Sequence, residues 1–150
     1  MPAFVTFGRI LFAVLFIYTG ATKLFAIQET ADFIATRLVV PDVIAPYATQ
    51  VETATAMTTP QLLAIAVGGL EAIAGLMIAL NFGARFFAML LIIYVGVATV
   101  LFYDFWNHTP PDNAKMLVDA LKNLSIIGAL CMIIGYGRTT RPAEAAYGDV

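Results

Sequence analysis

The segment from Gln61 to Ala84 is long enough to cross a bilayer as a helix, and it carries a single formal charge, the carboxylate of Glu71. An ionisable residue in the middle of a span costs at least about 2.5 kcal/mol on membrane-insertion scales, so it is usually kept inside a helix bundle and given a partner there. The apolar segment therefore predicts a membrane span, and Glu71 within it predicts a polar contact inside the protein.

The composition of the chain also indicates a membrane protein. Hydrophobic residues make up 61% of the 150 residues and charged residues only 12%, whereas an average soluble domain has roughly 25% charged residues. We predict an all-α, polytopic membrane protein, a four-transmembrane-helix bundle without a separate soluble domain. The expected spans cover approximately residues 4–27, 61–80, 85–105 and 115–137. A net charge of −2 with no cluster of Lys and Arg argues against a nucleic-acid partner.

Two basic residues frame the first expected span. Arg9 lies near one end of its apolar run and Lys23 near the other, where long side chains can reach the membrane surfaces. A charged start followed by an apolar core and small residues is also typical of a signal peptide. We expect this segment to be retained as a spanning helix.

The longest polar stretch runs from Gln28 to Pro60 and is predicted to be an acidic loop on one side of the membrane. Between Ala31 and Val40 apolar residues recur at helical spacing, and Pro41 ends the run. We therefore predict a short interfacial helix in this first outer loop, lying over the mouth of the bundle. A surface loop with one helical turn is an equally good interpretation of the same pattern.

Other polar residues inside the spans are candidates to contact Glu71. Lys23 and Lys122 are the deepest cations by helix rise, so we predict that Glu71 pairs with one of them. Small residues share the face of Glu71 at helical spacing, which favours close approach of a neighbouring helix: Ala64, Gly68 and Gly75. The predicted structural polar network consists of Arg9, Arg85, Glu71 and Lys122.

Single cysteine and histidine residues argue against several kinds of redox centre. Cys131 is the only cysteine, so the chain lacks a dithiol that could pass electrons to a quinone. His108 is the only histidine, whereas a haem in a membrane bundle usually takes two. Asp104, His108 and Asp112 have the spacing of a metal cluster, but two consecutive prolines stop one helix from carrying all three, so we predict no metal site.

The arrangement of charges predicts an orientation in the membrane. With four spans, the amino terminus, the turn near Asn81 and the carboxyl tail share one side. That side collects Arg9, Arg85, Arg138 and Arg141, and the other holds Lys23, Arg37 and Lys115 with most of the acidic residues. The positive-inside rule then favours cytoplasmic termini. We expect a multi-pass protein of a bacterial-type cytoplasmic (inner) membrane.

Three short motifs follow one another along the spans. The first consists of Arg9, Leu11, Phe12, Phe16, Gly20, Lys23 and Leu24. The second consists of Glu71, Gly75 and Leu76, with Arg85 after a turn, and the third of Lys122, Asn123, Leu124 and Gly128. In this order they resemble the DoxX family of four-helix integral membrane proteins. The chain departs from the common family pattern in its Val51–Pro60 insertion and its Phe105–Asp112 loop.

The resemblance implies one of two roles. The first is a small accessory subunit of a larger membrane complex, in which a buried Glu–Lys pair organises the bundle and other subunits contact its lipid-facing surface. The second is a quinone-binding subunit of an oxidoreductase, with a quinone as cofactor and electrons from a partner. The candidate quinone-binding residues are Glu71, Lys122, Asn123, Lys23, Tyr103 and Trp106. A small-molecule or ion transporter is a third possibility, disfavoured because the spans show no inverted repeat and no broken helix.

Overall fold

The structure is a computed structural model that describes residues 2–37, 45–107 and 109–136. Its long helices are α1 (Pro2–Phe25), α4 (Thr59–Ala79), α5 (Ala84–Phe102) and α6 (Asp112–Tyr136). All four are long and apolar enough to cross a membrane. Two shorter helices, α2 (Ile27–Ala35) and α3 (Ala45–Thr55), connect α1 to α4, and the 3-10 turn η1 (Phe105–Asn107) follows α5. The predicted all-α, four-span architecture is confirmed.

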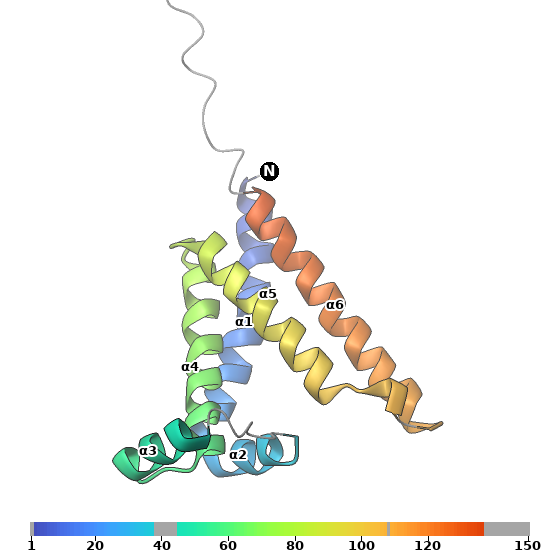
Figure 1. The fold of residues 1–150 in the computed structure, drawn as a ribbon. Coiled ribbons are helices and arrows are strands. Elements are labelled where there is room, and N and C mark those ends of the chain that lie inside the picture. Colours follow the sequence, from blue (N-terminus) through green and yellow to red (C-terminus); the bar gives the residue numbers. More distant parts are fainter. Residues whose placement is uncertain (1, 38–44, 108, 137–150) are drawn as a thin grey trace, which may run out of the picture.

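The long helices run alternately up and down, so each is antiparallel to the next (Figure 1). One end of the molecule holds the start of α1, the turn between α4 and α5, and the end of α6, while the other holds α2, α3 and η1. Helix α1 packs chiefly on α4, and α6 packs chiefly on α5. Towards the end that carries α2, α5 and α6 lean away from α1 and α4 (Figure 1).

Small residues allow α1 and α4 to pack closely. A Cβ atom on Gly20 would lie 2.5 Å from the backbone nitrogen of Ala72, and one on Gly75 would lie 3.0 Å from the backbone nitrogen of Ile17. The face of α4 predicted from helical spacing is buried as expected: Ala64, Gly68, Glu71 and Gly75. Close backbone contact is a common way to join helices in lipid, where hydrophobic association adds little.

The apolar core lies towards the end that carries the α4–α5 turn. Its largest fully buried side chains are Ile78, Leu91 and Leu130, which come from three different long helices. The turn itself places Asn81 at a φ of 59° and Gly83 at a φ of 57°. Asn and Gly tolerate this left-handed conformation better than other residues, which explains the sharp reversal predicted there.

The connection between α1 and α4 differs from the prediction. Helix α2 begins at Ile27, earlier than the predicted start at Ala31, and ends at Ala35. The rest of the predicted interfacial helix, residues 38–40, lies outside the described residues. Helix α3 was not predicted, because its residues are mostly Ala and Thr with no apolar stripe. Its threonine hydroxyls donate to carbonyls one turn earlier, as in Thr53 to Thr49 at 2.8 Å.

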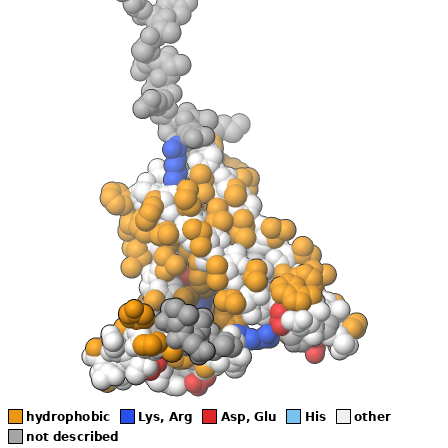
Figure 2. Space-filling model, in the orientation of Figure 1, with side chains coloured by type: hydrophobic (Ala, Val, Ile, Leu, Met, Phe, Trp, Pro, Cys, Tyr) orange, Lys and Arg blue, Asp and Glu red, His pale blue; other side chains and the backbone are white. Residues whose placement is uncertain are grey.

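The surface of the long helices suits a lipid environment. Large hydrophobic side chains are exposed on all four, including Val14, Ile73, Ile93 and Leu124. Figure 2 shows hydrophobic side chains spread over the middle of one face, while most charged side chains gather near its two ends. An apolar middle between polar ends is the pattern expected of a protein that contacts the bilayer.

Candidate ligand site inside the bundle

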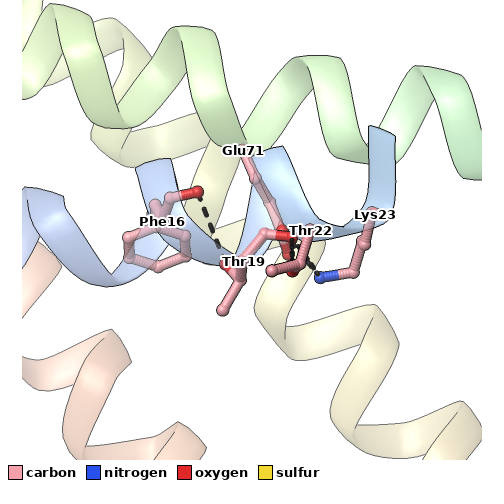
Figure 3. A network of polar contacts seen from close by, with 5 residues as sticks. All are labelled: Phe16, Thr19, Thr22, Lys23 and Glu71. Carbon is pink, nitrogen blue, oxygen red and sulfur yellow. Dashed lines mark hydrogen bonds and ion pairs between the residues drawn. The ribbon is translucent and has the colours of Figure 1, made fainter. Parts of the chain in front are cut away.

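An ion pair joins α1 to α4 in the interior of the bundle. Nζ of Lys23 lies 2.7 Å from Oε2 of Glu71, and the two side chains are 27% and 5% exposed. Figure 3 shows the Glu71 side chain reaching from α4 across α1 to the Lys23 ammonium. Of the two lysines considered as partners from the sequence, Lys23 makes the contact.

The neighbouring backbone supplies a second acceptor for this lysine. Nζ of Lys23 donates to the carbonyl oxygen of Thr19 at 3.5 Å, one helical turn back on α1. An ammonium group has three N–H donors. Among the described residues, Glu71 and Thr19 account for two of them, which leaves one donor for a further group.

The ion pair lies on the wall of a cavity of about 370 Å³. The polar residues that line it come from α1, α2, α4, α5 and α6, and from the residue that follows α5: Thr19, Lys23, Thr30, Glu71, Tyr94, Tyr103 and Asn123. The remaining lining is apolar and includes the rings of Phe16, Phe33 and Phe102. An apolar cavity with a few convergent polar groups is the usual form of a small-molecule site.

Tyr94 is a member of the site that sequence reasoning missed. It lies on α5, lines the cavity, and its phenol is within electrostatic reach of the Glu71 carboxyl group. One available signal was its position as a phenol in the middle of an otherwise apolar span. Buried tyrosine hydroxyls generally need a hydrogen-bond partner, so such a residue is a candidate for a polar site.

Asn123 lines the cavity, but its neighbour Lys122 does not. The side-chain amide of Asn123 donates to Oγ1 of Thr99 at 2.9 Å, which ties α6 to α5 beside the cavity. Nζ of Lys122 instead lies 2.9 Å from Oδ1 of Asp119 on its own helix, and its side chain is 69% exposed. The alternative pairing of Glu71 with Lys122 is therefore wrong, because consecutive residues point about 100° apart around a helix.

Three other predicted residues also lie away from the cavity. Trp106 is 57% exposed and packs edge-on against Phe105. Arg85 is exposed at the start of α5, and Arg9 is half-buried near the start of α1. Neither arginine lines the cavity. The described residues thus do not join Arg9, Arg85, Glu71 and Lys122 into one network, because the two arginines lie towards the opposite end of the bundle.

Helix α2 covers the end of the cavity that faces α3 and η1. Thr30, Phe33 and Ile34 of this helix line the cavity. Helix α2 packs on α4. A side-chain hydrogen bond also joins the two helices, from Nε2 of Gln61 to Oε1 of Gln28 at 2.8 Å. We name α2 and the residues that follow it to Arg37 the roof.

The metal cluster considered from the sequence includes His108, which lies outside the described residues.

Two contacts hold the roof to the end of α5. Nη1 of Arg37 lies 3.0 Å from Oδ1 of Asp104. The rings of Phe33 and Phe102 are stacked, with centroids 5.0 Å apart. The roof is therefore attached on both sides of the cavity.

The fold and this site define a four-span helical membrane protein with a largely apolar cavity whose wall carries an interhelical ion pair. The chain belongs to the DoxX family, whose family model matches residues 4–104. The match includes Lys23, Glu71 and Tyr94 but ends before α6, so the third motif, around Asn123, lies outside it. No curated protein and no solved structure matches the chain.

Proposed function

We propose that this protein is an accessory membrane subunit that binds the head group of a quinone in the cavity beside Lys23 and Glu71. An electron-carrying partner in the same membrane complex supplies the electrons. The observation that carries the proposal is the convergence of five polar side chains on one cavity inside an apolar bundle: Lys23, Glu71, Tyr94, Tyr103 and Asn123.

The lining of the cavity matches the chemistry of a quinone head group. Its two carbonyl oxygens accept hydrogen bonds, and ammonium, phenol and amide groups donate them. Its ring is flat and apolar on both faces, and the cavity presents the aromatic rings of Phe33, Phe102 and Tyr103. A volume of about 370 Å³ accommodates a single substituted ring and lies near the lower limit for small-molecule sites.

The ion pair places an ammonium group and a carboxyl group at the wall of the cavity. Reduction of a quinone to a hydroquinone takes up two electrons and two protons, so groups that exchange protons must lie nearby. We assign this exchange to Lys23 and Glu71, of which Lys23 is the more accessible. The sequence has no pair of cysteines or histidines to carry electrons, which is why the proposal includes a partner.

A purely structural role is the second candidate, and the same ion pair favours it. The pair connects α1 to α4 next to their closest backbone contact at Gly20. Buried ion pairs often fix how elements pack and do no chemistry. On this account the protein is still an accessory subunit, but the cavity has no ligand.

The two candidates differ in the effect of replacing Glu71 by Gln. A glutamine keeps the size of the side chain but cannot exchange a proton, so the quinone role predicts normal assembly with a loss of quinone-coupled activity. Equal loss of assembly and activity supports the structural role. The activity is measured in native membranes, and assembly is measured by co-purification of the partner with the tagged chain.

Binding is tested directly by the quinone content of the purified protein. We expect wild type to retain quinone through purification. Lys23→Met should lower the quinone content about tenfold or more, since a hydrogen bond that involves a charged group contributes about 1.5–3 kcal/mol, and Asn123→Ala should lower it by less, since a neutral hydrogen bond contributes about 0.5–1.5 kcal/mol. Lys122→Met is the matched control, because Lys122 is also a lysine in a span but lies outside the cavity. Quinone loss in the control, or no quinone in wild type, contradicts the proposal.

The proposed setting is a bacterial-type inner membrane with both termini in the cytoplasm. Its support is the small excess of basic residues on the terminal side, where Arg9 and Arg85 lie. In this orientation α2, α3 and η1 lie at the outer surface of the membrane, and α2 is an interfacial helix.

A further inference from the structure

We infer that the ligand of the cavity is a lipid-borne molecule with a long apolar tail, and that it enters from the bilayer between α1 and α6. This inference rests on the proposed function and names the form of quinone that the site takes. It depends on which sides of the cavity are closed and which side is lined by exposed apolar residues.

The end of the cavity towards water is closed by the roof. Ala31 of α2 is only 2% exposed, so this helix is seated firmly on the bundle. The Arg37–Asp104 ion pair and the Phe33–Phe102 stack attach the far side of the roof to the end of α5. A water-soluble molecule would have to separate both contacts to enter at this end.

The side between α1 and α4 is also closed. These two helices meet backbone to backbone, and a Cβ on Gly20 would lie 2.6 Å from the carbonyl oxygen of Gly68. Because a single added methyl group does not fit between the helices at Gly20, a ring cannot pass between them there. On the opposite side, α6 is joined to α5 by the hydrogen bond from Asn123 to Thr99.

We place the opening at the boundary between α1 and α6 because, among the lining residues on the long helices, only Leu15 of α1 is exposed, whereas Val67 of α4 and Ala98 of α5 are half-buried. Leu15 and Thr19 of α1 and Asn123 and Ile126 of α6 line the cavity there. Leu15 is 42% exposed although it lines the cavity, so it lies at the boundary between the cavity and the lipid. Helix α6 packs mainly on α5 in the described part of the chain. The separation between α6 and α1 grows towards the end of the molecule that carries the roof (Figure 1).

These walls predict how a ligand lies in the site. The head group occupies the polar part of the cavity beside Lys23 and Asn123, and the tail passes between Leu15 and Ile126 into the acyl chains. A long tail contributes binding energy through its own apolar burial, and it also concentrates the ligand in the bilayer, from which it enters. A short, water-soluble quinone has neither advantage.

The first test locks the roof. In a Cys131→Ser background, Arg37→Cys and Asp104→Cys are joined with a short thiol-to-thiol cross-linker in lipid nanodiscs. Uptake of a quinone with an isoprenoid tail is then compared before and after cross-linking. We expect the rate and extent of uptake to be unchanged. Loss of uptake on cross-linking shows that the ligand enters beneath the roof and overturns the inference.

The second test narrows the proposed opening. Leu15→Trp places a bulky ring at the boundary, and Leu15→Phe is a milder form in case the first does not fold. Val14→Trp is the matched control, since Val14 is the adjacent residue, is 53% exposed, and does not line the cavity. We expect Leu15→Trp to slow uptake of the tailed quinone about tenfold or more, within the range of association rates among variants of one site, and the control to leave it unchanged.

The two tests separate failure of this inference from failure of the proposed function. Equal uptake by the Leu15→Trp and Val14→Trp variants overturns the route of entry. Equal affinity of wild type for tailed and tail-free quinone overturns the requirement for a tail. Either result leaves quinone binding in place. If wild type binds neither quinone, the proposed function itself is wrong, and the inference falls with it.

Discussion

The ion pair between Lys23 and Glu71 joins two spans of the bundle, α1 and α4. The Glu71 carboxylate is almost fully buried and has its cationic partner on a different span. We expect Lys23→Met to lower the free energy of unfolding in detergent by about 3 kcal/mol, because breaking a buried pair by removing one partner leaves an uncompensated charge. Equilibrium denaturation followed by circular dichroism measures this change.

Two variants serve as controls for the Lys23 measurement. Lys122→Met removes a lysine whose side chain is 69% exposed beside Asp119, so the expected loss is at most about 1 kcal/mol. The double variant Lys23→Met with Glu71→Leu removes both charges and is expected to recover much of the lost stability. Equal effects of Lys23→Met and Lys122→Met would falsify the assignment of Lys23 as the buried partner.

Gly20 lies at a tight contact between α1 and α4. A Cβ there would lie within 3.0 Å of three backbone atoms of α4, so the helices themselves must separate to accept it. We expect Gly20→Ala to destabilise the protein by about 1–3 kcal/mol, the usual cost of overpacking. The free energy of unfolding in detergent is again the measurement.

Gly69 is the matched control for this substitution. It lies on α4 one residue from Gly68, but a Cβ there meets nothing within 4 Å. Gly69→Ala is therefore expected to leave stability unchanged or to raise it by up to about 1 kcal/mol through helix propensity. A loss at position 69 as large as that at position 20 is incompatible with the proposed close contact.

The sequence identified the most important residue of the site but only part of its surroundings. Glu71 was evident because a lone charge in an apolar span needs a partner, and the depth of Lys23 made it one of two candidates. Depth alone did not separate Lys23 from Lys122, since that choice depends on the rotation of each helix about its axis. Tyr94 was missed because its neighbours on α5 are apolar and nothing in the chain order links it to Glu71.

The junction between α3 and α4 is an element-scale contact with its own pH dependence. Oε1 of Glu52 accepts hydrogen bonds from the backbone nitrogen and the hydroxyl of Thr59, both at 2.6 Å. The hydroxyl bond, followed by the backbone bond, holds the pKa of Glu52 below its ordinary value of 4.5. Because the folded-state pKa is lowered, this contact stabilises the junction at pH values above the unfolded pKa and is lost as the pH falls through the folded pKa.

Hydrogen exchange of the α3 amides tests this dependence. We expect wild type to protect α3 better than Glu52→Gln at neutral pH, and the difference to shrink as the pH falls through the lowered folded-state pKa of Glu52. Comparison of the two proteins at each pH removes the intrinsic effect of pH on exchange. A difference that does not shrink as the pH is lowered from neutral through the carboxyl range contradicts the assigned contact.

At the scale of elements, the sequence predicted the spans well and the connections poorly. The spans are recognisable because hydrophobicity and length are enough to define them, and the turn at Asn81 and Gly83 has a local signal. Helix α3 has no such signal. Its Ala- and Thr-rich segment satisfies its own backbone and side-chain hydroxyls without an apolar face, and Pro46 falls in the first turn, where proline is tolerated.

The orientation of the whole molecule in its membrane follows from the end at which each charge lies. In a Cys131→Ser background, Thr53→Cys reports on the end that carries α3, and Phe82→Cys reports on the α4–α5 turn at the other end. We expect a membrane-impermeant maleimide added to intact cells to label only the Thr53 position, and to label the Phe82 position after permeabilisation. The opposite pattern contradicts cytoplasmic termini.

The two members of the ion pair are also separated in the order of synthesis. Lys23 lies near the end of the first span, where an ammonium group can remain at the membrane surface until a partner arrives. Glu71 lies in the middle of the second span and cannot do so. We therefore expect α1 to be in place when α4 leaves the translocation channel, so that the two helices enter the bilayer together as a helical hairpin.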